Sequence, residues 1–506
     1  MLTVTNGAKH DWENMPLDEL AFGNAMDCNF TLRLYKELGR KMKETKVNFV
    51  YENLLKDILV ILSMVENRGI EVDQEYLSSL DEILSESIEE LEASLLKLSP
   101  IDDFNPRSTQ QTAEVLFTSA GFDLTPVEFS AKTKTPKISE AHLVKVLEDT
   151  SDSETREFME TLMKYKYRVK QHRTYVKGVK GAIEYNDDGR IYSNYNFATV
   201  VTGRLSCSTY SVGAKKKGVS FHTLPRKDEE SGEINIRNLM KADSKKAFIA
   251  ADFSQAELRM LAQCCRDESL IEAFNSGQDL HKFTASLVFD KPIDAITKEE
   301  RQIAKSVSFL IVYGGGPFKL SEQVGKPVGY CKNIFKSYQD AFPKVFSWIN
   351  RVHRGIRKDG HAISLFGRRR HLSNVNSPVR SYQYRALRQG MNFVIQSSAS
   401  DLMLHSIKRL HRYNKVLGLG MDILATVHDS VEVQCDLHNM DKCIETLKYV
   451  LPYTDDFKDM YGIDFVVPFE VDIEAGTSFG NLLDAQFDGN GRVLNGKEIA
   501  EFVARG

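Results

Sequence analysis

Two short apolar runs that each end in an aspartate are the clearest feature of the hydrophobic pattern. The run Ala247–Ala251 is followed directly by Asp252, and the run Ile423–Val427 is followed two positions later by Asp429. Apolar runs of four to eight residues are typical of buried β-strands. A helical pattern begins at Glu257, shortly after the first run. The pattern therefore predicts two strands that each carry a carboxylate at the end, and a helix after the first of them.

A longer amphipathic segment lies between these strands in the sequence. Arg301, Lys305, Phe309 and Tyr313 are spaced four residues apart, so they share one face of a predicted helix. The glycines at 314–316 end the pattern. The basic end of such a helix is either solvated or placed to neutralise phosphate groups.

Helical periodicity also dominates the first third of the chain. Leucine and isoleucine recur at helical spacing over 54–62 and again over 77–88. Ser108, followed three residues later by a glutamine, predicts the start of another helix. Two strand predictions come from shorter patterns. One is a hairpin over 183–195, around an Asn-Asp-Asp-Gly turn sequence, and the other is a strand over 465–469.

Composition changes this picture only locally. The chain has 506 residues, 42% of them hydrophobic, which is enough for several lobes around a large core. The formal net charge of −4 does not favour nucleic-acid binding. However, 164–180 holds seven lysines and arginines, three interleaved tyrosines and no acidic residue, and Lys215–Lys217 adds a second basic cluster. This density suits contacts with phosphates, although a solvated helix face is the commoner explanation of such a run.

Cysteine usage and the absence of targeting patterns bear on the compartment. The seven cysteines are scattered without Cys-x-x-Cys spacing, which favours reduced thiols, a cytoplasmic location and no zinc site. No signal peptide, basic transit peptide or apolar run of about 18 residues is present, so no membrane association is expected.

Three segments together resemble the motifs of family-A (Pol I-like) DNA polymerases, in the expected order. They are Ala250–Arg259, Arg301–Gly314, and the strand that ends in His428 and Asp429. Further matches are Thr202–Ser206, Phe221–Arg226, Asp279–His281, Phe366–Arg370, and the helix positions Arg388, Asn392 and Gln396. The resemblance covers roughly residues 47 to 485. It implies an α+β right-hand polymerase, with an antiparallel palm and helical fingers and thumb.

The resemblance also implies a division of the chain. Residues 46–190 would form the thumb, 191–275 the first part of the palm, 276–385 the fingers and 386–506 the second part of the palm. Residues 1–45 resemble the end of a DnaQ-like exonuclease domain, with Asp27 at its last motif. The other acidic motifs of that domain are missing, and one aspartate cannot hold two metals, so no proofreading is expected from this chain alone. The alternative for 1–45 is an amphipathic helix packed on the palm.

The implied chemistry is phosphoryl transfer with two metal ions. Asp252, Asp429 and Lys305 would be catalytic, and the two aspartates with the backbone carbonyl of Phe253 would hold two Mg²⁺ ions. The incoming dNTP would be bound by Gln255, Glu257, His281, Arg301, Lys305, Phe309 and Tyr313. Glu257 would exclude a 2′-hydroxyl group, with Tyr313 as its partner. Primer-template DNA would be contacted by Arg204, Arg388, Asn392, Gln396 and His428.

Several positions depart from the family pattern. Ser430 stands where Glu is usual after His-Asp, and Phe253 where Tyr is common. Gln302, Ser308 and Leu310 replace the frequent Arg, Asn and Gly. These departures suggest a phage or organellar member that serves phage-type DNA replication, in the host cytoplasm if viral.

The expected partners are primer-template DNA and dNTPs, and a separately encoded exonuclease or processivity factor is a further candidate. Two other functions stay open. A single-subunit RNA polymerase shares the two aspartates and the helix lysine, but Glu257 and Phe309 argue against it. A degenerate, non-catalytic DNA-binding subunit would have lost an aspartate or Lys305, and all three are present.

Overall fold

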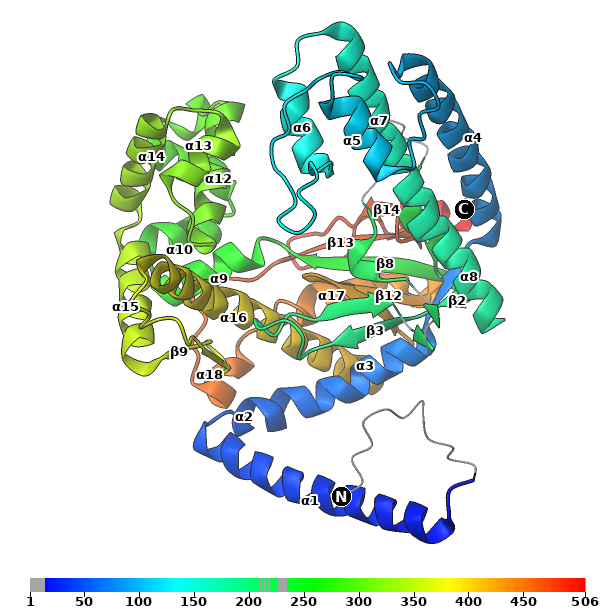
Figure 1. Ribbon diagram of the computed structural model, residues 1–506. Coiled ribbons are helices and arrows are strands. Elements are labelled where there is room, and N and C mark those ends of the chain that lie inside the picture. The colour runs from blue at the N-terminus through cyan, green and yellow to red at the C-terminus, as the bar shows by residue number, and fades with distance from the viewer. Residues whose placement is uncertain (1–13, 210, 213–214, 217–218, 226–233, 506) are drawn as a thin grey trace.

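An antiparallel sheet runs through the middle of the molecule, and a helical lobe rises at each side of it (Figure 1). This arrangement comes from a computed structural model that describes residues 14–209, 211–212, 215–216, 219–225 and 234–505. It confirms the predicted right-hand α+β fold. Lys217 of the second basic cluster and Arg226 of the Phe221–Arg226 segment lie outside the described residues.

Strand β8 (Lys246–Phe253) is at the centre of the sheet and carries Asp252 near its end. It pairs antiparallel with β12 (Ser430–Asp436) on one side and with β13 (Val471–Ser478) on the other. The strand order is β11-β12-β8-β13-β7-β1-β2, with β14 on β13. The remaining bounds are Asp422–Val427 for β11, Met240–Lys241 for β7, Ile70–Val72 for β1, Arg190–Ile191 for β2 and Asn481–Asp484 for β14. The two predicted strands are confirmed as β8 and β11: Asp252 is the penultimate residue of β8, and Asp429 follows β11 by two residues.

Helices cover the sheet with an extensive hydrophobic core. The 38-residue helix α16 (Arg380–Leu417) packs against α9 (Ala256–Cys265), α15 (Pro343–Asp359) and α17 (Met440–Val450). Helix α3 (Lys56–Arg68) packs against α16 and β11, and the periodic residues Leu54, Ile58 and Leu62 are buried there. The apolar side chains of these helices join those of β8 and β12 in one cluster, so the sheet and its helices form the rigid base of the molecule.

One helical lobe contains the predicted amphipathic helix, α12 (Lys298–Val312). A capping box starts it: Thr297 Oγ1 accepts from the Glu300 amide, and the Glu300 carboxylate accepts from the Thr297 amide. Gly314 ends it with φ +67°, and a Cβ there would lie 2.8 Å from the Arg388 side chain. The neighbouring helices are α10 (Glu268–Asn275), α11 (Leu280–Phe289), α13 (Pro317–Val324) and α14 (Val328–Ala341).

The other lobe has its own hydrophobic cluster, centred on Phe158, Leu162 and Tyr165. Its helices are α4 (Gln74–Leu98), α5 (Thr109–Phe117), α6 (Glu140–Glu148), α7 (Ser153–Gln171) and α8 (Lys177–Asn186). Ser108 caps α5 as predicted. The basic run 164–180 follows α7 into α8, but two of its tyrosines, 165 and 175, are buried and serve the core. The lobe boundaries proposed from the sequence stay predictions.

Two strand predictions are wrong. Residues 183–186 end helix α8, and β2 pairs with β1, more than 100 residues away, while β3 (Ser193–Asn196) pairs with β4 (Ser206–Thr209). A local pattern does not reveal a partner as distant as β1. Residues 465–469 form no strand, because their backbone bonds to α9 side chains instead: the Val466 amide donates to Gln263, and Arg259 donates to the Pro468 carbonyl.

Helix α1 (Leu17–Glu44) stands apart from the core at the bottom of Figure 1. None of its residues is buried, and Phe22, Phe30 and Leu34 are each more than half exposed. The alternative of an amphipathic helix packed on the palm is therefore wrong for this segment. Its interpretation as the end of an exonuclease domain stays a prediction.

The short remaining elements connect these parts. They are α2 (Asn48–Val50), β5 (Ser211–Val212), β6 (Lys215–Lys216), β9 (His361–Ile363), β10 (Arg369–His371), α18 (Asp456–Tyr461) and α19 (Gly496–Arg505). None of the helices in the described part of the chain is both long and apolar enough to span a bilayer.

Candidate active site

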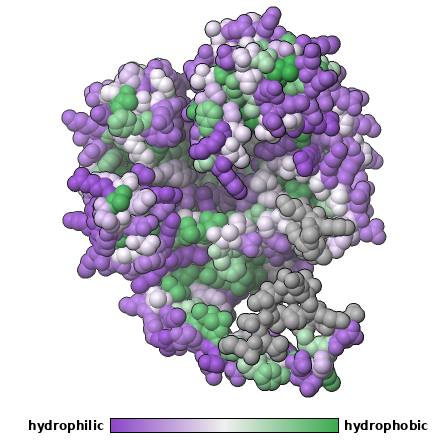
Figure 2. All heavy atoms as spheres, viewed as in Figure 1, coloured by the Kyte–Doolittle hydropathy of each residue, from purple (hydrophilic) through white to green (hydrophobic). Residues whose placement is uncertain are grey.

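A cavity of about 880 Å³ lies on the sheet between the two lobes. Figure 2 shows this face of the molecule hollowed at that place, with hydrophilic residues in the hollow. Twelve residues singled out from the sequence line the cavity: Arg204, Asp252, Phe253, Gln255, Glu257, His281, Arg301, Lys305, Phe309, Tyr313, His428 and Asp429. The remaining three, Arg388, Asn392 and Gln396, lie on α16 beside it. Folding thus brings residues that are more than 200 positions apart in the sequence into one site.

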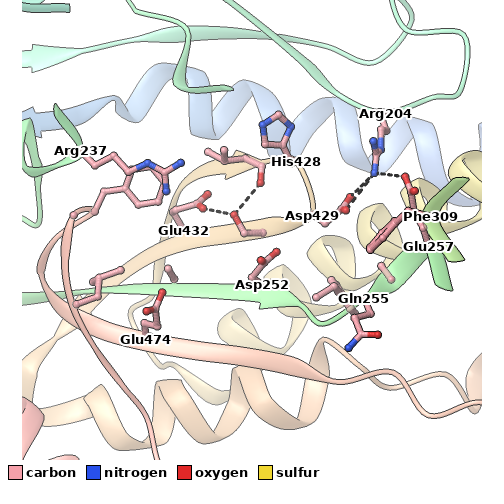
Figure 3. Close-up of a pocket in the computed structure, with 18 of the residues that line it drawn as sticks. Arg204, Arg237, Asp252, Gln255, Glu257, Phe309, His428, Asp429, Glu432 and Glu474 are labelled. Atoms are coloured by element: carbon pink, nitrogen blue, oxygen red, sulfur yellow. Dashed lines mark hydrogen bonds and ion pairs between the residues drawn. The ribbon is translucent and has the colours of Figure 1, made fainter. Parts of the chain in front are cut away.

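The two strand-end aspartates lie side by side at the base of the cavity (Figure 3). Asp252 comes from β8, and Asp429 from the two-residue turn that joins Val427 of β11 to Ser430 of β12. His428 holds the left-handed conformation in this turn, with φ 59°. The Phe253 amide donates to the Asp429 carbonyl oxygen at 3.1 Å, which fixes the turn to the end of β8.

Arg204 bridges two carboxylates of the site. Its Nη2 atom donates to Glu257 at 2.7 Å and to both oxygens of Asp429 at 3.2 and 3.3 Å (Figure 3). Glu257, in the first turn of α9, is only 6% exposed. Burial in this geometry requires a partner for the charge, and Arg204 provides it.

Glu257 also connects the sheet to α12 and α16. Gln396 Nε2 donates to its Oε1 atom at 3.1 Å. Burial, and then the neighbouring Glu257 carboxylate, raise the pKa of Tyr313 to about 12. On the same face of α16, Asn392 donates to the Val312 carbonyl at 3.3 Å. The end of α12 is therefore held against α16 at the point where Glu257 enters the cavity.

The basic face of α12 forms one wall. Lys305 and Phe309 both line the cavity, and the Phe309 ring lies 6.1 Å from that of His281. Arg301 is paired with Asp279 at 2.9 Å, and Asp279 also caps α11. Burial, followed by the positive charge of Arg301, lowers the pKa of His281 to about 4. His281 is therefore a neutral hydrogen-bonding group near pH 7.

Sequence reasoning missed the residues that line the sheet side of the cavity. These are Asn235, Arg237, Glu432, Glu474 and Phe479, together with small residues such as Ala250 and Gly480. A signal for Glu432 was present: Ser430, Glu432 and Gln434 alternate with valines, so all three polar residues face one side of β12. For Glu474 the equivalent signal depends on its pairing with β8.

The donor set fits hard divalent cations. The Asp252 and Asp429 carboxylates and the Phe253 carbonyl are oxygen donors, and Mg²⁺ commonly takes one or two carboxylates and completes its shell with water and substrate phosphates. Among the described residues, no three His, Cys, Asp or Glu side chains converge as a preformed metal cage. The Arg204 guanidinium on Asp429 shows that this carboxylate accepts a cation at the site.

The comparisons with known proteins agree with this geometry. The sequence profile of DNA polymerase family A matches residues 74–481. Relatives include DNA polymerase I of Borreliella burgdorferi, 28% identical over 93% of this chain and 48% of its own length. The thermostable DNA polymerase I of Thermus caldophilus is 30% identical over 79% of this chain and 45% of its own length. The chain thus spans about half the length of the curated relatives it matches.

A solved structure extends the likeness to three dimensions. The POL domain of Pol1 from M. smegmatis, in complex with a DNA primer-template and dNTP, superposes with a TM-score of 0.77. It is 26% identical, and the match covers 89% of this chain and 74% of that domain. Because the family profile matches most of the length of this chain, the chain belongs to DNA polymerase family A.

Proposed function

We propose that this chain is a template-directed DNA polymerase that adds dNTPs to a primer 3′ end by a two-metal mechanism. The observation that carries the proposal is the meeting of Asp252 and Asp429 at strand ends, in a cavity whose wall is the basic face of α12. Phosphoryl transfer needs in-line positioning and neutralisation of charge, and these groups provide both.

Two Mg²⁺ ions would be held by the carboxylates of Asp252 and Asp429 and by the Phe253 carbonyl. When bound, such ions stabilise the attacking and leaving oxygens of the displacement. The tie between the Phe253 amide and the Asp429 carbonyl would keep the two carboxylates at a fixed separation. Arg204 would have to release Asp429 when the cations bind, because both compete for the same oxygens.

The incoming dNTP would lie along α12. Lys305 and Arg301 would neutralise its phosphates, and neutral His281 would donate a hydrogen bond to a phosphate oxygen. Phe309 would stack on the base or sugar, and Tyr313 would lie near the templating position. Glu257, held by Arg204 and Gln396, would fill the space beside the 2′ position, and Gln255 would complete the sugar side.

The primer-template would cross the cavity toward the lobe that carries 164–180. Arg204, Arg388, Asn392, Gln396 and His428 surround the cavity and would probe the primer terminus and the minor groove, where correct base pairs present similar acceptors. The exposed basic residues of α7 and α8 would neutralise backbone phosphates. The M. smegmatis domain, whose complex contains a DNA primer-template and dNTP, supports this arrangement.

The proposal also concerns the kind of replication that the enzyme serves. Ser430 and the other departures favour a phage-type enzyme, whereas the relatives named above are bacterial DNA polymerases I. A separately encoded exonuclease or processivity factor would act beside it. The buried, paired Glu257 favours DNA synthesis over the alternative of RNA synthesis, because it leaves no space for a 2′-hydroxyl group.

Primer extension on a defined template tests the proposal. Asp252→Asn and Asp429→Asn should each lower the single-turnover rate to below about one per cent of wild type while leaving duplex affinity within about threefold, since phosphate contacts elsewhere dominate binding. Asp472→Asn is the matched control, because Asp472 of β13 is directly opposite Asp252 of β8 and does not line the cavity. It should keep most of the activity. Extension by either active-site variant above a few per cent would contradict the assignment.

A further inference from the structure

One buried carboxylate in the cavity has no place in the roles described so far. Glu432 is 1% exposed and lines the cavity, and its Oε2 atom has no hydrogen-bond partner among the described residues. A buried polar atom without a partner costs about as much free energy as a lost hydrogen bond. Such an atom on a cavity wall points to a group that the cavity holds when it is occupied.

The sheet register places Glu432 beside Asp252. Ser430 of β12 is directly opposite Asp252 of β8, and Glu432 is opposite Ala250, two residues further along. Facing residues of antiparallel strands point to the same side, so Glu432 is the diagonal neighbour of Asp252, with Cα atoms about 7–8 Å apart. Figure 3 shows both side chains on the cavity side of β8.

Ser430 links Glu432 to the turn that carries Asp429. The Ser430 hydroxyl is hydrogen-bonded to the Glu432 carboxylate and lies 2.9 Å from the Val427 carbonyl oxygen. Val427 and Ser430 are the paired residues that close the turn around Asp429. One side chain, Ser430, therefore links the Glu432 carboxylate to the turn that holds Asp429.

The charges around Glu432 favour an additional cation. Burial raises the pKa of Glu432 to about 7. The hydrogen bond from Ser430 lowers this pKa, and the negative charge of Asp252 raises it. The positive charge of Arg237 lowers it by less than Asp252 raises it. Repulsion from Asp252 thus exceeds attraction to Arg237. Glu474, the other neighbour of Ala250, also lines the cavity, but it is exposed, so water screens its charge. A divalent cation at Asp252 would relieve this repulsion.

We propose that Glu432 is a positioning residue of the metal site, which acts on Asp429 through Ser430 and on the cations from the strand position beside Asp252. It would supply the acidic group that is missing at position 430, where the family pattern has Glu. This rests on the proposed two-metal function and deepens it. Glu432 lies two residues along β12 from Ser430, so both side chains are on the same face of the sheet.

Titration of the DNA-free protein with Mn²⁺, followed by the EPR signal of the free ion, tests this without depending on activity. Glu432→Gln keeps the shape and removes the charge, so Mn²⁺ should bind about tenfold more weakly than to wild type. Glu474→Gln is the matched control: it removes one charge at the same register on the other side of Ala250, from an exposed residue, and should change affinity by less than about twofold. Glu432→Asp, which keeps the charge, should retain affinity within about threefold.

Primer extension supplies the second measurement. In Glu432→Gln, the Mg²⁺ concentration for half-maximal rate should rise about tenfold, while the rate at saturating Mg²⁺ and the KM for dNTP stay within about threefold of wild type. Ser430→Glu combined with Glu432→Gln should restore the wild-type Mg²⁺ requirement. Thermal unfolding of Glu432→Gln without divalent ions should show no loss of stability, which establishes that the variant is folded.

Equal shifts in Glu432→Gln and Glu474→Gln, or unchanged Mn²⁺ affinity in Glu432→Gln, would overturn the proposal. A loss of thermal stability with an unchanged Mg²⁺ requirement would also overturn it, by showing a structural role. If wild type binds Mn²⁺ in this pattern but does not extend primers, the polymerase function fails while the role of Glu432 in cation binding stands.

Discussion

Arg204 Nη2 lies 3.2 Å from Asp429 Oδ2, so a carboxylate proposed to hold metal is already paired with a cationic side chain. The two residues are 225 positions apart, and the same nitrogen also donates to Glu257. In this arrangement Arg204 would compete with a divalent cation for Asp429. Metal binding and release of Arg204 toward DNA would then be coupled events.

Removing Arg204 tests this competition. Arg204→Ala should strengthen Mn²⁺ binding to the DNA-free protein by about three- to tenfold, because the positive charge that lies within 4 Å of the Asp429 carboxylate is lost. The same variant should extend primers at least tenfold more slowly, since the contact with primer-template DNA that we propose for Arg204 would be lost as well. Mn²⁺ titration and single-turnover extension measure the two effects.

Arg204→Lys is the control for charge alone. It keeps the cation but cannot reproduce the fork geometry of a guanidinium, so it should bind Mn²⁺ like wild type and still extend slowly. If Arg204→Ala binds Mn²⁺ no better than wild type, the two cations do not compete for Asp429.

The environment of Glu257 leads to a prediction on sugar choice. Glu257→Ala should raise the ratio of rNTP to dNTP kcat/KM by about tenfold or more, because in the proposed mode of dNTP binding the buried side chain would occupy the space of a 2′-hydroxyl group. Glu257→Gln is nearly isosteric and should keep most of the discrimination. Comparable ratios in wild type and Glu257→Ala would place the discrimination elsewhere, whereas loss in both variants would assign it to charge.

How far the sequence could predict this site depends on how far apart in the sequence the contacting residues are. The ends of β8 and β11 and the face of α12 follow from local patterns, which is why the sequence places Asp252 near the end of a strand, Asp429 just after one and Lys305 on a helix. The Arg204–Asp429 pair and the diagonal between Glu432 and Asp252 depend on how distant segments pair. The wrong hairpin over 183–195 has the same origin in part, since β2 pairs with β1, more than 100 residues away, whereas β3 pairs with the nearby β4.

Phe309 allows a test of how the nucleotide lies on α12. A phenylalanine here offers no hydrogen bond, so the resemblance implies that the substrate's own 3′-hydroxyl group sets the phosphate geometry. In Phe309→Tyr the new hydroxyl group would replace it, and one hydrogen bond to a charged group is worth about 1.5–3 kcal/mol. The ddNTP/dNTP incorporation ratio should therefore rise at least tenfold.

The termination ratio on one template measures this effect. Phe335→Tyr provides a control for an added hydroxyl group elsewhere in the same lobe, because Phe335 of α14 does not line the cavity. It should leave the ratio unchanged. A wild-type ratio in Phe309→Tyr would contradict the placement of this helix face along the nucleotide.

The raised pKa of Glu432 makes stability depend on pH in a defined direction. Burial raises this pKa from 4.5 to about 7, so between these values the folded protein binds a proton that the unfolded chain has lost. The protonated carboxyl favours folding at low pH, and this contribution is lost as the pH rises to about 7. Above that, the buried carboxylate faces Asp252 without its proton, while Arg237 compensates only in part.

Glu432→Gln, which cannot ionise, should therefore unfold at nearly the wild-type temperature at pH 5 and about 1–3 °C higher at pH 8, measured in EDTA. Glu474→Gln, at an exposed position of the same register, should show no such trend. Saturating Mg²⁺ at pH 8 should shrink the difference, because a cation at Asp252 stabilises the ionised form of Glu432. A difference in unfolding temperature between Glu432→Gln and wild type that stays constant from pH 5 to pH 8 would show that Glu432 does not titrate in this range. If Mg²⁺ enlarges this difference, the Glu432 carboxylate opposes the bound cation.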